Sequence, residues 1–336
     1  MNILAFESSC DETAAAVVKD GRTVLSSVIA SSADMHAIYG GVVPEIASRQ
    51  HVQAIVGLAD EALRQAGLGK GEIDAVAVTD APGLIGALLV GVSFAKSVAY
   101  GLGVPLIPVH HVRGHIAANY IAHPDLEPPF LCLCVSGGTT ALVDVGDYTR
   151  FRMLGSTRDD AAGECFDKIA RVLGLGYPGG APMDRLAQGG DDRAFPFPRG
   201  QVAGHPLDMS FSGLKTAALN VIHNAQQKGQ ELNLHDLAAS FAAAVSDCLV
   251  PRVMEAAEEL GYDKIVTAGG VAANSRIRAD LTRACQEAGA RLWMPPLSLC
   301  GDNAAMIGCQ GYYEYQAGHT AGWGLNAKAS RDIGLG

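Results

Sequence analysis

The sequence predicts an α/β fold built from two copies of one β-β-β-α-β-α unit. Three short β-prone segments lie in a row within residues 2–31, and strand-like and helix-like segments alternate after them. The same pattern restarts at residue 130, at an offset of about 127–129 residues (130 − 2 = 128 for the first strand). Strands that alternate with helices favour sheets with helices on both faces. We therefore expect two duplicated domains with mixed sheets and an interdomain cleft.

The elements of the first copy follow from hydrophobic spacing and from turn residues. Lys19-Asp20-Gly21 has the composition of a hairpin turn, and Pro44 suits the first turn of a helix. The expected strands are 2–6, 13–18, 22–30, 73–79 and 105–109, and the expected helices are 44–67, 84–100 and 111–121.

The second copy is longer and carries additional helices. Its expected strands are 130–135, 140–145, 148–154, 265–268 and 291–294, and its expected helices are 160–173, 182–188, 214–227, 234–260, one from about 274, and 302–316. Residues 195–213 are rich in Pro and Gly, so we expect them to be irregular. The predicted division is an N-terminal domain at 1–125, completed by 325–336, and a C-terminal domain at 126–324 with a helical insertion at about 190–260.

Composition describes a globular protein and limits its partners. Apolar residues make up 49% of the chain and charged residues 18%. The first thirteen residues have no basic, apolar leader, and the uncharged run at 81–95 is shorter than the roughly 18 residues of a membrane span. We expect a cytoplasmic protein with no membrane partner. A net charge of −10 means that a nucleic-acid partner would need a local basic patch or a helper protein.

His111-Val112-Arg113-Gly114-His115 is a candidate metal-binding motif at the start of a predicted helix. The i,i+4 spacing puts both imidazoles on one face, within reach of one cation. Zinc metalloproteases share this spacing but have a glutamate beside the first histidine as general base, and Val112 stands there instead. The pair favours a metal site without protease chemistry, although ordinary surface or core histidines can have the same spacing.

Asp302 is the expected third ligand. It lies before the last predicted helix, 302 − 111 = 191 residues after His111, and a helix N-cap is the alternative role. If the duplicated domains face each other, Asp302 comes opposite His111 and His115. Two imidazoles and one carboxylate with open positions suit iron(II) or zinc, and the sequence does not choose between them.

Gly-rich segments of the second copy offer backbone groups to a phosphate or a nucleotide. Val135-Ser136-Gly137-Gly138-Thr139 presents amides without Cβ obstruction. Gly269-Gly270 precedes a helix whose start, at Asn274, favours an anion or a ribose. Gly176-Tyr177-Pro178-Gly179-Gly180 suggests a backbone wall against a flat ligand such as adenine. A plain hairpin turn and a plain N-cap are the alternatives for the first two segments.

The duplicated layout resembles the actin, Hsp70 and sugar-kinase (ASKHA) superfamily, in which two RNase-H-like domains bind a nucleotide. Nearly end to end, the chain also resembles the universal tRNA adenosine threonylcarbamoyltransferase family, bacterial TsaD type, formerly described as an O-sialoglycoprotein endopeptidase. The matching motifs are Glu7 to Thr13, Tyr39 to Glu45, Pro82-Gly83-Leu84, His110 to His115, Val135 to Gly138, Gly163 to Lys168, Tyr177 to Gly180, Ser210 to Thr216, and Gly269-Gly270-Val271 with Asn274.

This resemblance implies transfer of a threonylcarbamoyl group from threonylcarbamoyl-AMP to the adenosine beside the anticodon, in tRNAs that read codons beginning with A, with release of AMP. It implies one divalent metal, iron(II) favoured over zinc, at His111, His115 and Asp302. It also implies a paralogous TsaB-type partner subunit and a small TsaE-type ATPase. The adenylate-binding residues that it implies, which would also take ATP- or ADP-like nucleotides, are Cys134, Val135, Ser136, Gly137, Gly138, Asp167, Gly180, Asp184 and Asn274.

Two positions depart from the family pattern. Thr139 stands where the family usually has His or Asn, which puts one side-chain contact near the phosphate or carbamoyl group in doubt. Cys134 stands where many bacterial members have Leu and archaeal members have a Tyr near the metal. A thiolate ligand and a small core residue are both open for Cys134.

Asp11 and Glu12, in the first hairpin loop, are the candidates to accept a proton from the adenine amine. Positioning of the substrates alone is the alternative. Candidate basic residues for tRNA are Lys19, Arg22, Arg49, Arg113 and Arg199. A small-molecule kinase would share the fold but would have no task for the histidines, and a non-catalytic binding subunit would not need the full set of motifs.

Overall fold

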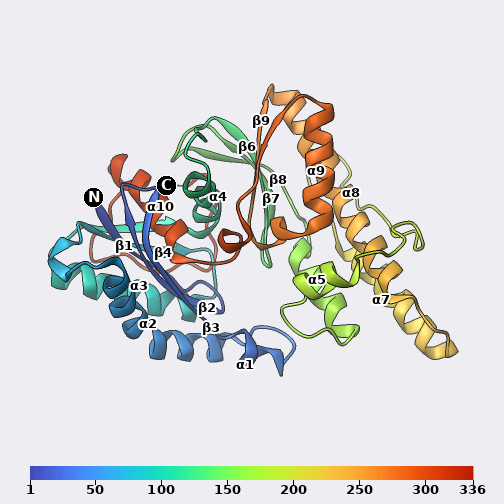
Figure 1. Ribbon diagram of the computed structural model, residues 1–336, viewed down its shortest axis with the longest axis horizontal. Coiled ribbons are helices and arrows are strands. Elements are labelled where there is room, and N and C mark those ends of the chain that lie inside the picture. Colours follow the sequence, from blue (N-terminus) through green and yellow to red (C-terminus); the bar gives the residue numbers. More distant parts are fainter. Residues whose placement is uncertain (336) are drawn as a thin grey trace. The chain divides into compact units, whose positions relative to one another are not determined.

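The computed structural model describes residues 1–335 (Figure 1). The chain forms two compact units. Unit 1 comprises Met1–Pro128, Val145–Arg152 and Pro295–Gly336, and unit 2 comprises Pro129–Asp144 and Met153–Met294. Each unit is built around one five-stranded sheet.

The sheet of unit 1 has the strand order β3-β2-β1-β4-β5. β1 (Asn2–Glu7) pairs antiparallel with β2 (Glu12–Lys19) and parallel with β4 (Ala75–Ala81), so the sheet is mixed as predicted. β3 (Thr23–Ser31) and β5 (Leu106–His110) are the edge strands. Asp20 and Gly21 have φ values of 50° and 75°, the conformation that a two-residue hairpin turn requires.

Alternate residues of these strands pack on opposite faces of the sheet. Leu4 and Phe6 of β1 belong to an apolar cluster with α2 (Pro44–Ala66) and α3 (Ile85–Leu102). Ile3 and Ala5 belong to a second cluster with α4 (His111–Ala122) and α10 (Ala304–Gln316). Because helices cover both faces, β1 and β4 are buried along nearly their whole length.

The sheet of unit 2 repeats this arrangement in the order β10-β9-β6-β7-β8. Its strands are β6 (Phe130–Val135), β7 (Thr140–Val145), β8 (Phe151–Ser156), β9 (Lys264–Ala268) and β10 (Arg291–Trp293). The first three begin 128 residues after β1, β2 and β3 (130 − 2, 140 − 12 and 151 − 23). Strand order and spacing therefore confirm the predicted duplication.

The helices of unit 2 build its core on this sheet. They are α5 (Ala162–Val172), α6 (Gly180–Leu186), α7 (Ser212–Lys228), α8 (Leu234–Leu260) and α9 (Ser275–Glu287). Asn233 and Asn274 cap α8 and α9 with their side chains, and Gly229 and Gly261 end α7 and α8 in the left-handed conformation. These caps explain why the expected helix ends lie close to the observed ones. The short elements α1 (Ala33–Ala37), η1 (Lys70–Glu72), η2 (Gly270–Ala273) and η3 (Leu297–Leu299) were not predicted.

α10 packs differently from the expectation. Its residues Ala304, Met306 and Ile307 pack on the sheet of unit 1, and unit 1 includes the chain from Pro295 on, whereas we expected the return to the N-terminal domain at residue 325. Helical spacing identifies the apolar face of a helix but does not say which sheet that face covers. The division into two RNase-H-like domains between residues 125 and 126 stays a prediction.

Two helices, α3 and α8, are long and apolar enough to span a membrane. In α8, 72% of the most apolar stretch is buried inside the protein, as in an ordinary core helix. In α3 only 33% of this stretch is buried. One or two such helices are weak evidence for a membrane, so the exposed apolar side chains of α3 need another explanation.

Candidate functional site

α4 carries the two predicted histidine ligands directly after a buried strand. β5 ends at His110, whose Nδ1 accepts a hydrogen bond from the backbone N–H of Val112 at 3.2 Å and so caps the helix. The i,i+4 spacing then places the rings of His111 and His115 edge to face, with centroids 4.6 Å apart. Their side chains are only 12% and 3% exposed, so the pair lies at the end of the sheet and not on an open helix surface.

A glycine between the histidines lets α10 approach α4. A Cβ atom at Gly114 would lie 2.7 Å from Cδ1 of Ile307, well inside van der Waals contact. Asn303 caps α10 by accepting a hydrogen bond from the backbone N–H of Met306 at 2.9 Å, and Asp302 comes immediately before it. Close helix packing therefore brings Asp302 to the histidines from within unit 1, and not from an opposing domain as expected.

The three predicted ligands converge. Oδ1 of Asp302 lies 3.5 Å from Nε2 of His111 and 3.1 Å from Nε2 of His115. One ligand atom from each residue can be chosen so that all lie within 4.8 Å of one another. Ligands bonded at about 2.1 Å to one cation stand roughly 3.0–3.4 Å apart at octahedral to tetrahedral angles. The two separations between Asp302 and the imidazole nitrogens are close to these values.

His115 gives a second, independent indication of a metal. Its two ring nitrogens are buried, and neither makes a hydrogen bond with any residue among 1–335, although Nε2 lies 3.1 Å from Oδ1 of Asp302. A buried polar group without a partner costs about 1–3 kcal/mol. A cation on His115 would remove this cost, so the residues present fit a divalent metal.

Glu7 completes the centre, and the sequence analysis assigned it no role. It is fully buried at the end of β1, and its Oε2 lies 3.0 Å from Nδ1 of His111. Thr79 Oγ1 donates to the same oxygen at 2.6 Å, and the backbone N–H of Ser9 donates to Oε1 at 2.5 Å. A carboxylate on Nδ1 keeps the proton there and directs the Nε2 lone pair toward a metal. The sequence feature that could have indicated this role is an acidic residue at the end of a strand, at the start of the motif Glu7 to Thr13.

The charges of this centre shift the pKa values of its members. Burial acts to lower the pKa of His111, but the carboxylates of Asp302 and Glu7 outweigh it and raise this pKa to about 9. Burial acts to raise the pKa of Asp302, but His111 and His115 lower it to about 2. The centre therefore favours positive charge between two carboxylates, a place that a metal cation can take.

The predicted catalytic carboxylates are adjacent in unit 1: Asp11 is the last residue of the loop after β1, and Glu12 is the first residue of β2. Burial, Asp11 and Asp302 together raise the pKa of Glu12 to about 9, which brings the loop within the electrostatic influence of the centre. Ser31 Oγ donates to Oε1 of Glu12 at 3.0 Å. With a pKa of about 9, Glu12 is protonated at neutral pH and is therefore not suited to accept a proton.

Two buried histidines hold the backbone of this loop. Nε2 of His51 lies 2.9 Å from the carbonyl oxygen of Cys10. The Ser32 hydroxyl donates to the carbonyl oxygen of Asp11 at 2.7 Å, and Nε2 of His36 lies 3.0 Å from that hydroxyl. Burial lowers the pKa of His51, which favours the neutral ring. Neither histidine was predicted, because His51 lies 41 residues after Cys10 and His36 acts on Asp11 only through Ser32, 21 residues after it.

The predicted phosphate loop of unit 2 is a tight turn in close contact with two other backbone segments. The N–H of Ser136 donates to the carbonyl of Thr139 at 2.7 Å, and the N–H of Thr139 donates to Ser136 Oγ at 3.1 Å. A Cβ atom at Gly163, at the start of α5, would lie 2.5 Å from the Ser136 carbonyl oxygen. A Cβ atom at Gly269, where φ is 91°, would lie 2.5 Å from the Val135 carbonyl oxygen. Only glycine permits these approaches.

Asp167 links α5 to the predicted adenine wall. The backbone N–H of Gly179 donates to Oδ1 of Asp167 at 2.7 Å, and α6 then begins at Gly180. The carboxylate of Asp167 therefore shapes the backbone of this loop, which is a supporting task and not only a ligand contact.

Asp184 links α6 to α9 in a similar way. Its Oδ1 accepts hydrogen bonds from the backbone N–H and the hydroxyl of Ser275, at 3.0 and 2.7 Å. The neighbouring Asn274 accepts from the N–H groups of Arg276 and Ile277 at 3.1 Å each, which is the N-cap role considered above. Together with the Gly163 and Gly269 contacts, these bonds bring all the predicted nucleotide segments into one continuous group of unit 2.

Cys134 has the surroundings of a core residue. It is buried in β6, where it pairs with Ala268 of β9, and its Sγ lies 3.7 Å from Sγ of Cys132. Burial and the neighbouring thiol raise the pKa of Cys132 well above its usual range. These contacts favour the small core residue over the thiolate ligand among the two alternatives.

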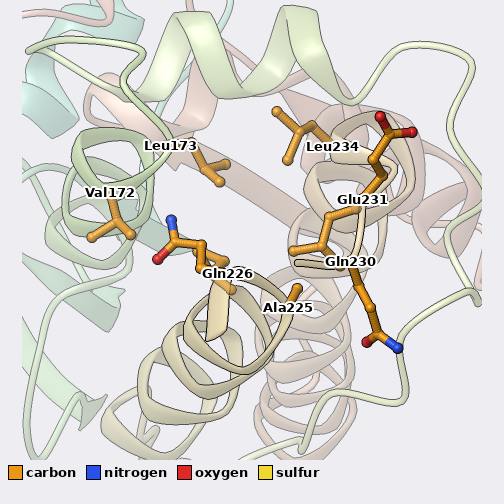
Figure 2. Close-up of a pocket in the computed structure, with 9 residues that line it drawn as sticks. Val172, Leu173, Ala225, Gln226, Gln230, Glu231 and Leu234 are labelled. Carbon is orange, nitrogen blue, oxygen red and sulfur yellow. The ribbon is translucent and has the colours of Figure 1, made fainter. Parts of the chain in front are cut away.

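One hollow in unit 2 lies away from these residues (Figure 2). It has a volume of about 340 Å³ and lies between the ends of α5 and α7 and the start of α8. Val172 and Leu173, Ala225 and Gln226, and Leu234 represent these three helices in its lining (Figure 2). It shares no residue with the predicted nucleotide group or with the metal centre.

Two of the basic residues predicted to contact tRNA are engaged inside the protein. Arg113 is 3% exposed and pairs with Glu314 at 2.9 Å. Arg22 donates to Tyr313 Oη at 2.7 Å and to the backbone carbonyl oxygens of Pro124 and Leu126 at 2.9 and 3.0 Å. Both guanidinium groups are used in internal bonds. The expectation of an RNA contact is wrong for the buried Arg113, and for the partly exposed Arg22 it stays a prediction.

Comparison with known proteins adds independent information. The sequence profile of the family "TsaD: tRNA N6-adenosine threonylcarbamoyltransferase" matches residues 23–309. A curated relative with the name tRNA N6-adenosine threonylcarbamoyltransferase, from Moorella thermoacetica, is 56% identical over 326 residues, which cover 97% of this chain and 95% of the relative. Proteins of the same name from Clostridium botulinum and Clostridium perfringens are 51% and 52% identical over 99% of this chain and 98% of their own lengths.

Solved structures support the fold. HypF from T. kodakarensis aligns with a TM-score of 0.65 and 18% identity, over 95% of this chain and 48% of that chain. The (R)-2-hydroxyglutaryl-CoA dehydratase component A of Acidaminococcus fermentans aligns with a TM-score of 0.54 and 17% identity, over 94% of this chain and 98% of that chain. At these identities the likeness shows the fold alone, and it confirms the predicted ASKHA fold class.

Proposed function

The chain belongs to the TsaD family of tRNA N6-adenosine threonylcarbamoyltransferases, and from this premise we propose which of its residues serve the reaction. It is an acyltransferase that modifies tRNA. We propose that threonylcarbamoyl-AMP is the donor and that the acceptor is the adenosine beside the anticodon in tRNAs that read codons beginning with A.

His111, His115 and Asp302 hold one divalent metal in this proposal. Support comes from the separations of 3.1 and 3.5 Å between the imidazole Nε2 atoms and the Asp302 carboxylate, and above all from the buried ring of His115, which has no hydrogen bond among the described residues. Two imidazoles and one carboxylate favour iron(II), and zinc accepts the same ligands. A cation bound there supplies Lewis-acid polarisation of a carbonyl oxygen.

The donor's adenylate binds to the continuous group of unit 2. The proposed contacts are Cys134, Val135, Ser136, Gly137, Gly138, Asp167, Gly180, Asp184 and Asn274, and the same group would take ATP- or ADP-like nucleotides. The glycine-dependent approaches at Gly163 and Gly269 support this assignment, because they join the 135–138 loop to the starts of α5 and η2, while an added Cβ at Gly137 or Gly138 would meet no described atom within 4 Å. Backbone amides of this loop would meet the negative charge that develops on the phosphate.

The reaction forms one bond and breaks one. The N6 nitrogen of adenosine attacks the carbamoyl carbon, the bond from that carbon to the phosphate oxygen breaks, and AMP leaves. The attacking amine loses a proton, which Asp11 accepts in our assignment. Glu12 is protonated at neutral pH, and its role in this proposal is to keep the hydrogen bond that it accepts from the Ser31 hydroxyl.

The exposed apolar face of unit 1 is the proposed docking surface for a TsaB-type partner subunit. Val52 and Val56 of α2 and Ile85 and Leu89 of α3 stand one turn apart on neighbouring helices and are 40–61% exposed. Exposed apolar patches of this kind mark interaction sites, and a partner here would explain why so little of α3 is buried. A small TsaE-type ATPase completes the proposed assembly, and a tRNA-modifying enzyme of this kind is expected in the cytoplasm.

The proposed function is tested in a reconstituted system with the partner subunits, preformed donor and tRNA. We expect His111→Ala to reduce modification by at least about 100-fold, because even partners outside the ligand shell contribute 10–100-fold in metal sites. Metal content, measured by mass spectrometry of the purified protein, should fall in parallel, while circular dichroism stays that of the wild type.

His235→Ala is the matched control, because His235 is exposed on α8 of unit 2 and belongs to neither site. It should keep both metal and activity. Unchanged modification by His111→Ala would contradict the proposed role of the metal centre.

A further inference from the structure

Residues 328–335 have no role in the proposed function, yet they form hydrogen bonds with β4 and with the start of α4, the helix that carries His111 and His115. The backbone N–H of Lys328 donates to the Asp80 carbonyl at 2.9 Å, and Ala329 accepts from the N–H of Gly83 at 3.1 Å. Arg331 makes a bidentate pair with the Asp80 carboxylate at 2.6 and 2.9 Å. These contacts fasten the segment across the end of β4.

The same segment also holds the start of α4. The carbonyl oxygen of Arg331 lies 3.0 Å from Nε2 of His110. Because Nδ1 of His110 already accepts from the backbone N–H of Val112, the ring must carry its proton on Nε2 and donate it to Arg331. His110 directly precedes His111, so this bond fixes the first turn of the metal-binding helix.

Arg113 makes the second attachment to α4. Its Nε and Nη2 donate to the carbonyl oxygen of Ile333 at 2.9 and 2.6 Å, and Nη2 also donates to that of Leu335 at 3.2 Å. The side chain is 3% exposed, and it lies between the two histidines in sequence. A buried guanidinium loses several charge-assisted hydrogen bonds if residues 333–335 move away, which is costly.

A second series of hydrogen bonds connects the segment to His111 itself. Gly83 bonds to Ala329, and the next residue, Leu84, donates its N–H to the carbonyl oxygen of Ser9 at 2.8 Å. Ser9 Oγ lies 3.1 Å from Nδ1 of His111. Residues 328–335 therefore reach the first histidine both through the helix start and through the Ser9 loop.

We propose that residues 328–335 are a positioning segment for the metal centre, so that docking of this segment and binding of the metal stabilise each other. The proposal rests on the proposed metal centre. Coupling of this kind is reciprocal: if docking favours metal binding, metal binding favours docking by the same factor. Outer partners of metal ligands typically contribute 10–100-fold to metal affinity.

The test measures the affinity of the full chain for zinc(II) and, without oxygen, for iron(II) by calorimetry. Arg331→Gln should weaken binding by roughly 10–100-fold. Because this change leaves Asp80 buried and unpaired, the double variant Asp80→Asn with Arg331→Gln serves where the single variant is unstable. The matched control is Lys96→Met, which removes an anchor from Nζ to the Leu325 carbonyl at 2.8 Å, just before the segment, and should bind metal as the wild type does.

The reciprocal arm uses only the wild type and needs no substitution. Hydrogen exchange of peptides that cover residues 328–335 should slow by a similar factor when metal is added. Tight metal binding with wild-type affinity in the double variant, together with exchange that metal does not change, would overturn the proposal and leave the metal centre intact. Failure of the wild type to bind either metal would overturn both.

Discussion

Asp11 and Glu12 are adjacent at the start of β2, and the surroundings of Glu12 keep its carboxyl group protonated. The pKa of Glu12 is raised to about 9 by burial and by the charges of Asp11 and Asp302. A carboxyl group in that state is neutral at pH 7 and cannot serve as a base. Substitutions that remove the charge of one or the other carboxyl group therefore distinguish their roles.

We expect Asp11→Asn to lower transfer from preformed donor by roughly 10²–10⁴-fold, the usual contribution of a general base. Glu12→Gln should change turnover far less, because the amide resembles a carboxyl group that is already neutral. Single-turnover rates of modified tRNA formation measure both, with nucleotide binding as the control for folding. Near-normal rates in both variants would remove the base hypothesis and leave positioning as the explanation.

The metal centre shows what could be predicted for single residues. His111 and His115 follow from an i,i+4 spacing that a helix converts directly into a shared face. Asp302 was expected at this centre, but from an opposing domain. It lies instead just before α10, a helix that packs within unit 1. Glu7 could not be assigned, because its role depends on the parallel pairing of β1 with β4, which brings Thr79 and the end of β5 beside it.

At the scale of elements, the ends of helices and the turns could be predicted from the sequence. The sheet on which each helix packs could not. α8 begins and ends where an Asn cap and a left-handed Gly require, and its span agrees with the expected 234–260. α10 has an equally clear apolar face, but that face fits either sheet until the packing is known. Small residues decide such packing, and Gly114 is the example next to the metal centre.

Gly163 provides a test of this packing in unit 2. Gly163→Ala puts a Cβ atom 2.5 Å from the Ser136 carbonyl oxygen, so α5 or the 136–139 turn must shift. We expect at least tenfold weaker binding of a non-hydrolysable adenylate, measured by calorimetry, and a loss of stability of about 1–3 kcal/mol from overpacking.

Gly213→Ala is the matched control for this change. Gly213 lies in the first turn of α7 in the same unit, and its added Cβ would meet no atom within 4 Å among the described residues. The control should bind the adenylate normally and be as stable as the wild type or slightly more stable. Equal binding by both variants would contradict a role of the Gly163 contact in shaping the nucleotide site.

At the scale of the whole molecule, charge and exposed apolar surface are the features on which the proposed assembly depends. A net charge of −10 opposes binding to a polyanion, and two of the five candidate basic residues are used internally. We therefore expect the isolated chain to bind tRNA weakly. The exposed apolar side chains of Val52, Val56, Ile85 and Leu89 form the proposed docking surface for the subunit that would contribute the rest of the tRNA contact.

A charged side chain on this face should weaken binding of the partner subunit without destabilising the fold of the chain. Leu89 is 40% exposed on α3, so Leu89→Glu leaves the core of unit 1 intact but puts a carboxylate into any apolar interface, where an unpaired charge costs several kcal/mol. We expect it to weaken binding of the TsaB-type subunit by at least 100-fold in analytical ultracentrifugation, with the thermal unfolding of the isolated chain nearly unchanged.

Leu260→Glu is the matched control, because Leu260 is also 40% exposed but ends α8 in unit 2. If Leu89→Glu and Leu260→Glu bind the partner equally well, the α2–α3 face is not the docking surface. If Leu89→Glu loses the partner, tRNA affinity and its salt dependence should fall to those of the isolated chain, since fewer phosphate contacts give a smaller salt slope.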